Sequence, residues 1–196
     1  MKIVGICASP RKNGNTDILL EKVLEGAKAQ GAETEKIVLS DLKILPVSEK
    51  EYETVAEDGF SVVQDDMNAV FRKIEESDAL VMASPIFFGS ISAQAKIMID
   101  RFQCVWLAKE KLNKKVFQKE KRGIFVSAQA TTRKDFFENA KSIVRHFFAT
   151  INVKYAGELF CPGVDTKGKV SEKPEVLQQA YELGATLVGA DPSVRP

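Results

Sequence analysis

The sequence is poor in the residues that build metal centres and disulfide frameworks. Its 196 residues include one histidine and three cysteines. A single histidine excludes histidine-rich metal sites. Cys7, Cys104 and Cys161 are odd in number and isolated in apolar surroundings, which indicates small buried thiols rather than disulfides or ligands. We therefore expect no bound metal.

The chain also lacks an excess of charge and a long hydrophobic run. It has 28 Lys and Arg against 27 Asp and Glu, a net charge of +1. This balance argues against nucleic acid or a membrane surface as a partner. Residues 3–8 form a run that is too short for a signal peptide or a membrane span. We expect a cytoplasmic protein.

What the sequence does have is a regular alternation of apolar runs and amphipathic stretches. The expected strands are residues 2–8, 35–39, 79–84, 123–128 and 153–161. Helices are expected at 17–30, 67–74, 93–107, from 133 and from 174. This order favours right-handed βαβ crossovers and a parallel sheet covered on both faces. No repeat or linker divides the chain, so we expect one domain over 1–196.

Two charged segments interrupt this pattern. Residues 41–64 form a connection longer than the ~12 to 15 residues usual for a structureless loop. Residues 49–66 carry seven acids and one Lys, whereas residues 109–122 carry seven Lys or Arg and two Glu. Two interpretations stay open. Either both segments are solvated connections, or they pair with each other across a subunit contact.

The most informative polar segment, residues 9–16, follows the first expected strand. Open parallel sheets bind ligands beyond the carboxyl ends of their strands, so a site is expected there. Gly14 frees the backbone so that N–H groups can converge beside the next helix N-terminus. Donors and positive charge come from Ser9, Arg11, Asn15 and Thr16. A plain helix cap would explain only the last two residues, so we expect a phosphate site.

A second candidate segment, residues 84–92, follows the third expected strand. Phe87 and Phe88 are successive loop aromatics that suit a flat apolar ligand, although both could equally be core under the loop. Gly89 would let a planar ligand approach the backbone. Beside a phosphate site, a flat ring with a phosphate tail explains the pair better. Residues 128–132, after the fourth strand, are small and polar enough to wall a ligand.

Candidates for catalytic side chains are scarce. His146 lies off the centre of an apolar helical stripe, so a surface imidazole is expected rather than a general base. A Ser-His-acid triad is not supported either, because the chain has no G-x-S-x-G elbow. We expect no catalytic side chain.

Five motifs then carry a resemblance to a known family. They are Ser9-Pro10-Arg11 with Asn15-Thr16, Asp65-Asp66-Met67, Ala83-Ser84-Pro85-Ile86-Phe87-Phe88-Gly89-Ser90, Ala93-Gln94-Ala95-Lys96 and Ile99-Asp100-Arg101-Phe102. With these motifs the chain resembles the NADPH-dependent FMN reductase family of flavodoxin-like proteins, and is nearest to the iron–sulfur flavoprotein branch. The resemblance is specific to about residue 105 and looser beyond it.

The resemblance implies a fold, a cofactor and a site. The fold would be an α/β flavodoxin-like three-layer sandwich with a five-stranded parallel sheet of order 2-1-3-4-5. The cofactor would be FMN, with NADPH or NADH as co-substrate, in a homodimer or homotetramer. The FMN phosphate would lie at Ser9, Arg11, Asn13, Asn15 and Thr16. The isoalloxazine would lie against Pro85, Ile86, Phe87, Phe88 and Gly89, with Ser127, Ala128 and Gln129 along a further edge.

The sequence departs from the iron–sulfur branch at the cluster ligands. That branch carries four cysteines between the second strand and the second helix. The matching positions here are Val47, Lys50, Glu53 and about Ser61, and none is a thiol. Because a [4Fe–4S] cluster needs four thiolates, we expect no iron–sulfur cluster. Phe87 is a second departure, since many relatives have Tyr there and this chain lacks that phenol.

The leading functional interpretation is an FMN-dependent NAD(P)H oxidoreductase. It would pass hydride from the nicotinamide to bound FMN and then electrons to a small-molecule acceptor such as a flavin or quinone. The alternative is a flavodoxin-like electron-transfer protein that binds FMN but does not use NAD(P)H. Such carriers tend to be acidic and this chain is neutral, yet the acidic segment keeps the alternative open. A third interpretation is a binding or regulatory protein without redox turnover.

Overall fold

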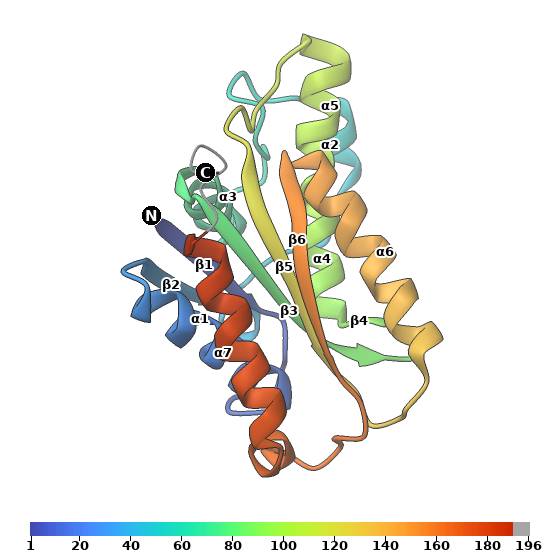
Figure 1. The fold of residues 1–196 in the computed structure, drawn as a ribbon. Coiled ribbons are helices and arrows are strands. Elements are labelled where there is room, and N and C mark those ends of the chain that lie inside the picture. The colour runs from blue at the N-terminus through green and yellow to red at the C-terminus, as the bar shows by residue number, and fades with distance from the viewer. Residues whose placement is uncertain (190–196) are drawn as a thin grey trace.

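A parallel β-sheet forms the centre of the protein (Figure 1); the computed structural model describes residues 1–189. Its parallel strands are β1 (Lys2–Cys7), β2 (Glu33–Val38), β3 (Ala79–Phe87), β5 (Lys121–Ala128) and β6 (Val153–Cys161). Their order is β2-β1-β3-β5-β6, and the short β4 (Ser90–Ile91) pairs antiparallel with the end of β3. Counting only the parallel strands gives 2-1-3-4-5, so the predicted flavodoxin-like topology is confirmed. The hairpin strand β4 was not predicted.

The helices lie in two layers, one on each face of the sheet (Figure 1). One layer is α1 (Asn15–Ala29) and α7 (Pro174–Gly189). The other is α3 (Met67–Glu76), α4 (Ala93–Arg101), α5 (Gln103–Leu112) and α6 (Lys134–Thr150). Shorter turns are α2 (Glu49–Glu53) and the 3₁₀ helices η1 (Leu39–Asp41) and η2 (Lys169–Glu172). Within residues 1–189 no helix is both long and apolar enough to cross a bilayer.

Burial on both faces of the strands explains their apolar sequences. In β1, Val4 and Ile6 belong to the core beneath α3–α6, whereas Ile3 and Cys7 belong to the core beneath α1 and α7. This is the two-residue period of a strand covered on both sides. The first eight residues of β3 are buried in the same way. The sheet therefore forms a rigid base whose carboxyl edge carries loops.

Two glycines let α1 and α7 pack with their backbones in contact. A Cβ at Gly26 would lie 1.9 Å from the carbonyl oxygen of Tyr181, and one at Gly184 would lie 1.8 Å from that of Val23. Any side chain at either position would push the helices apart. The close contact fixes α1, whose first turn faces the loop after β1.

The helix predicted over residues 93–107 is divided in the structure at Phe102. Tight turns flank the break, because the N–H of Phe102 donates to Ile99 O and the N–H of Val105 donates to Phe102 O, each at 3.0 Å. The break lets the Phe102 ring pack 4.8 Å from that of Phe71. Arg101, the last residue of α4, points instead toward the connection after β2 and is fully buried. Periodicity alone did not reveal this change of direction.

Buried Arg101 holds the long connection of residues 42–66 in place. Its guanidinium donates to Glu51 Oε1 at 2.9 Å, Ser61 Oγ at 2.7 Å, Asp65 Oδ2 at 2.6 Å and the carbonyl of Leu45 at 3.0 Å. The segment lacks regular structure except for α2 among the described residues, so these bonds substitute for a sheet or a helix layer. Local sequence patterns do not determine the conformation of residues 42–66. Arg101, which is distant in the sequence, determines it instead.

The acidic and basic segments contact each other within one chain, an arrangement that neither interpretation from the sequence included. Lys111 Nζ donates to the carbonyl of Tyr52, and Lys114 Nζ donates to that of Glu57, each at 2.6 Å. A Cβ at Gly59 would lie only 2.5 Å from the Val116 side chain. The two lysines bind backbone carbonyls rather than carboxylates.

Candidate functional site

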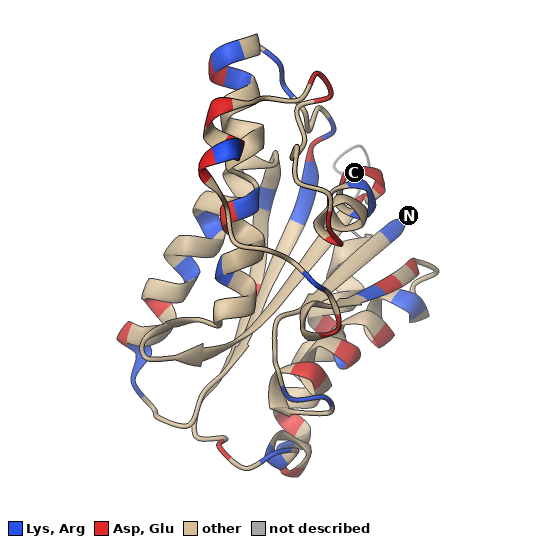
Figure 2. Ribbon diagram, turned by 180° about the vertical axis from the view of Figure 1, so that it is seen from behind, with Lys and Arg blue, Asp and Glu red and all other residues tan. Residues whose placement is uncertain are grey.

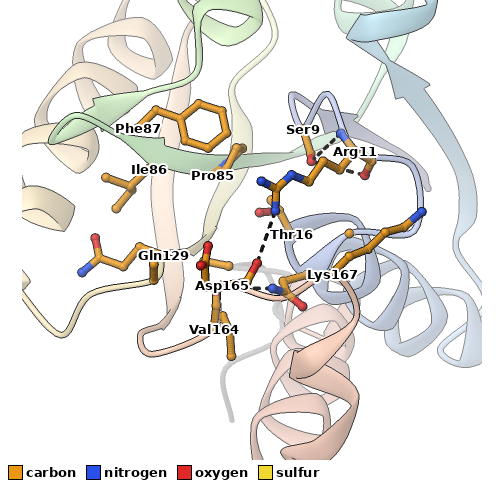
Figure 3. Close-up of a pocket in the computed structure, with 14 residues that line it drawn as sticks. Ser9, Arg11, Thr16, Pro85, Ile86, Phe87, Gln129, Val164, Asp165 and Lys167 are labelled. Carbon is orange, nitrogen blue, oxygen red and sulfur yellow. Dashed lines mark hydrogen bonds between the residues drawn. The ribbon is translucent and has the colours of Figure 1, made fainter.

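A pocket lies at the carboxyl edge of the sheet, where β1, β3, β5 and β6 end (Figure 3). Nine of the predicted site residues line it: Ser9, Arg11, Asn15, Thr16, Pro85, Ile86, Phe87, Ala128 and Gln129. The predicted residues Asn13, Phe88, Gly89 and Ser127 are not among its lining. The pocket has a volume of about 130 Å³ and is partly open to solvent, so it is smaller than the roughly 300–1,000 Å³ of a typical ligand pocket. A flat ligand would therefore extend from the pocket over its open rim.

The loop between β1 and α1 leaves backbone N–H groups without a side-chain cap at the start of α1. The N–H of Arg11 donates to Ser9 Oγ at 3.1 Å, and the N–H of Gly14 donates to Arg11 O at 3.0 Å. Gly14 precedes α1 and makes no side-chain cap, so the N–H groups of the first turn stay available to a ligand. A Cβ at Gly14 would lie 2.9 Å from Arg11 O. A side chain there would open the turn.

Asp17 supports this loop through a buried carboxylate. Its Oδ2 accepts the N–H of Asn13 at 2.8 Å, and its Oδ1 lies 3.1 Å from Lys36 Nζ. Asn13 has a positive φ of 53°, which asparagine tolerates better than most residues. Beside this carboxylate, burial raises the pKa of the Cys7 thiol to about 12. Cys7 is therefore protonated at neutral pH and acts as a packing residue.

A second loop, residues 164–170, closes the pocket opposite β3 and was missed from the sequence. Asn15 Nδ2 donates to Thr166 O at 3.0 Å, and Asn15 Oδ1 accepts the N–H of Val170 at 3.1 Å. Arg11 Nη1 donates to Asp165 O at 3.2 Å (Figure 3). Asn15 thus uses its amide to hold this loop, and Lys167 joins the lining. The one signal for this loop in the sequence is that it follows the last strand, whose carboxyl end lies at the same edge of the sheet.

The third wall is the end of β3, which continues past the sheet into a hairpin. Pro85, Ile86 and Phe87 line the pocket. The pairing of Phe87 with Ser90 leaves a two-residue turn at Phe88 and Gly89, whose φ values are 49° and 74°. Positive φ at both positions defines a type I′ hairpin. The structure therefore directs Phe87 and Phe88 differently: Phe87 lies at the pocket and Phe88 at the tip.

Buried hydroxyl groups connect this hairpin to the sheet. Ser127 Oγ donates to Ser84 O at 2.8 Å, the N–H of Ser92 donates to Ser84 Oγ at 3.0 Å, and Ser92 Oγ donates to Ala8 O at 2.7 Å. All three serines are fully buried. Ser127 therefore holds β3 at Ser84, two residues before the hairpin pairing begins.

Gln129 carries an orphaned acceptor in the fourth wall. Its Nε2 donates to Thr131 O at 2.9 Å and to Arg133 O at 2.7 Å. Both amide hydrogens are used in this way, which fixes the orientation of the amide. Its Oε1 is the one buried side-chain polar atom without a partner in the described part of the chain. An acceptor in this state fits a ligand that brings an N–H donor, as a flavin ring does.

The cysteines do not form a cluster. Cys7 lies in β1, Cys104 in α5 and Cys161 in β6, and each is buried. Burial raises the pKa of Cys104 to about 12. No group of three or more His, Cys, Asp or Glu side chains in residues 1–189 could hold a metal ion. The residues present do not fit an iron–sulfur cluster.

The order of the parallel strands defines a flavodoxin-like fold. The chain belongs to the NADPH-dependent FMN reductase family, whose model matches residues 1–156. It is 37% identical over 101 residues to an iron–sulfur flavoprotein of Methanocaldococcus jannaschii. It is 41% identical over 101 residues to one of Archaeoglobus fulgidus. These matches cover 52% of this chain, and 51% and 45% of those proteins, so the chain spans about half the length of its curated relatives.

Solved structures share the whole fold at low sequence identity. An NAD(P)H:quinone oxidoreductase from Methanothermobacter marburgensis superposes with a TM-score of 0.74 at 20% identity, covering 95% of this chain and 96% of that one. A flavone reductase superposes with a TM-score of 0.73 at 21% identity, covering 97% of this chain and 62% of that one. Identities this low establish the fold alone.

Proposed function

We propose that the protein is an FMN-dependent oxidoreductase that takes hydride from NAD(P)H and passes electrons to a second small-molecule acceptor. The main support is the lining of one pocket at the carboxyl edge of the sheet. Nine residues predicted to bind FMN line it, and they come from three separate parts of the sequence. Membership of the NADPH-dependent FMN reductase family supports the same reaction class.

The residues present suit each part of FMN. The turn at Ser9, Arg11 and Thr16, with the first N–H groups of α1, would hold the phosphate. Pro85 to Phe87 would carry the ring, which the small volume of the pocket leaves at the open rim. Gln129 Oε1 would accept a hydrogen bond from a ring N–H. We propose FMN rather than a dinucleotide flavin because the pocket, as the described residues form it, has only one turn, residues 9–16, that would bind a phosphate.

When bound, FMN supplies the atom that accepts hydride, and the protein supplies position and electrostatics. A hydride carries both electrons, so no side chain has to act as acid or base. This agrees with a pocket lined by one carboxylate, Asp165, and by no histidine. The apolar residues Pro85, Ile86 and Phe87 would exclude water from one region of the ring. Arg11 and Lys167 favour anionic ligands.

We propose further that the protein binds no iron–sulfur cluster. The segment that would hold one is instead tied to Arg101 through Glu51 and Ser61. Three buried cysteines in separate elements cannot supply four thiolates. We also retain a homodimer or homotetramer as part of the proposal.

The alternative function is an FMN electron carrier that docks through acidic residues. The exposed acidic residues Glu49, Glu53 and Glu57 favour it. However, no residue of the 42–66 segment lines the pocket, and α2 lies against α5 at the opposite end of the sheet (Figure 1). Docking there would leave the redox partner far from the flavin, so the reductase is the better account.

Anaerobic mixing with NADPH tests the proposal. FMN-loaded protein should lose its visible flavin absorbance when NADPH or NADH is added without oxygen, and should regain it when a quinone or free flavin follows. If neither nucleotide bleaches the flavin while chemical reductant does, the carrier function is favoured and the reductase proposal is wrong.

A further inference from the structure

Phe88 is an apolar side chain held in solvent at the tip of the hairpin, one residue beyond Phe87 of the pocket. Its relative exposure is 108%, against 41% for its neighbour Phe87, which lines the pocket. Its φ of 49° lies in the left-handed region, which a bulky residue seldom adopts. Asn-Gly is the usual pair for such a turn. Here Phe stands at the asparagine position, so neither packing nor turn chemistry accounts for it.

The turn that presents Phe88 is rigidly supported. Asn139 Nδ2 donates to Gly89 O at 2.7 Å. A Cβ at Gly89 would lie 3.2 Å from the Phe136 ring, so α6 packs directly beneath the tip. The base of the hairpin is bonded to the sheet through Ser84 and Ser92. Phe88 therefore keeps one position relative to the pocket.

Cationic groups lie near the base of this hairpin and in the neighbouring pocket. Arg133 stacks over Phe136 at 4.3 Å and bonds to Asp135, and exposed Lys134 follows it. On the pocket side, Arg11 and Lys167 accompany Asp165. Figure 2 shows the positive residues on the segment that enters α6. A flat apolar surface near positive groups suits a ligand with an aromatic ring and phosphates, and suits an apolar protein partner less well.

We propose that Phe88 is a positioning residue for the hydride donor: its ring packs against the pyridine nucleotide as that nucleotide approaches the flavin. This inference rests on the proposed function and adds the contact that orients its substrate. The fixed turn would hold the aromatic surface ready before the nucleotide arrives, which lowers the ordering cost of binding.

Phe88→Asn tests the contact without damaging the fold, because Asn-Gly is the preferred pair for this turn. Phe88→Trp keeps an aromatic surface. Tyr52→Asn, at another exposed aromatic outside the pocket, is the matched control. Calorimetric titration of each FMN-loaded variant with NADP⁺ measures binding without turnover, and anaerobic stopped-flow with NADPH measures flavin bleaching.

We expect Phe88→Asn to bind NADP⁺ roughly tenfold more weakly, the scale of one aromatic stacking contact. Its bleaching should need correspondingly more NADPH, while its FMN affinity and thermal midpoint stay at or above wild type. Phe88→Trp and Tyr52→Asn should match wild type.

Three results would overturn the inference. One is a Phe88→Asn variant with wild-type NADP⁺ affinity while the wild type is bleached by NADPH, so that only the role of Phe88 fails. Another is weaker binding that accompanies loss of an oligomer in sedimentation, which would assign the tip to a second copy of the chain. The last is a wild type that neither binds NADP⁺ nor is bleached, which removes the proposed function as well.

Discussion

At the scale of single residues, the site depends on a few side chains whose neighbours already determine their orientation. Arg11 reaches across to Asp165 O, and Thr16 is buried in the first turn of α1. Asn15 was predicted to hold phosphate, yet its amide is occupied by Thr166 and Val170. That Asn15 binds the FMN phosphate stays a prediction. With its side chain occupied, its backbone N–H in the first turn of α1 would be the donor.

Arg11→Ala and Thr16→Ala should each weaken FMN binding. Each removes a charge or a donor from the proposed phosphate site, a loss of about 1 to 3 kcal/mol for a charge-assisted bond. Fluorescence quenching of FMN by the apoprotein measures the dissociation constant. Lys12→Ala is the control, because Lys12 is exposed and paired with Asp41. Unchanged affinity in both test variants would refute the phosphate assignment.

Gln129 offers a test of the ring end of the pocket. An FMN analogue methylated at ring N3 lacks the N–H that Oε1 would accept, so wild-type protein should bind it more weakly than FMN by about 1 to 3 kcal/mol. Gln129→Leu should lose this discrimination, because both ligands then meet an apolar side chain. Comparing two ligands on one variant cancels any loosening of the loop. Equal discrimination by both proteins would contradict the role given to Oε1.

At the scale of elements, the strands and most helices could be predicted because their signals are local. The apolar runs before residues 9, 85 and 129 indicated strands, and the Pro174 helix begins where expected. Gly31 follows the α1 C-cap with a φ of 86°, a conformation that favours glycine just past a helix end. The hairpin at Phe88-Gly89 lacks the Asn-Gly signature, so it was missed. The 164–170 loop joins the site only through the fold, which no local pattern encodes.

The buried Arg101 network should dominate the stability of the 42–66 segment. Arg101→Met would leave Glu51 and Asp65 buried without their cation, a loss of about 3 to 5 kcal/mol in the free energy of unfolding. Lys96→Met is the control on the same helix, since Lys96 forms an exposed pair with Asp100 worth at most about 0.5 kcal/mol. Urea denaturation compares the two. Equal effects would show that the network carries no special weight.

The same network predicts a loss of stability in acid. Burial raises the pKa of Asp65, but bonds from Arg101 and from the N–H groups of Leu45 and Met67 outweigh it, so its pKa is lowered. A lowered pKa adds stability above the unfolded value of about 3.9, and this is lost as pH falls through the folded value. Between pH 7 and pH 3, Asp65→Asn should therefore lose less stability than wild type in urea melts. A parallel loss would contradict this linkage.

At the scale of the whole molecule, the two ends of the sheet have separate tasks. The carboxyl edge gathers the pocket, whereas the charged 49–66 and 109–122 segments pack together at the other end. The sequence offered pairing of these segments only across a subunit contact. Their contact within one chain could not be predicted, because Lys111 and Lys114 bind backbone carbonyls, which no charge pattern indicates. The curated relatives are named iron–sulfur flavoproteins, so cofactor content is where this chain is expected to differ from them.

The visible absorption spectrum of protein produced and purified without oxygen tests the central claim most directly. The account predicts the bands of one FMN per chain, released by denaturation as free FMN, with no iron or acid-labile sulfide in the same sample. A broad iron–sulfur absorption with about four iron atoms per chain, or a protein that neither carries nor takes up FMN, would contradict it.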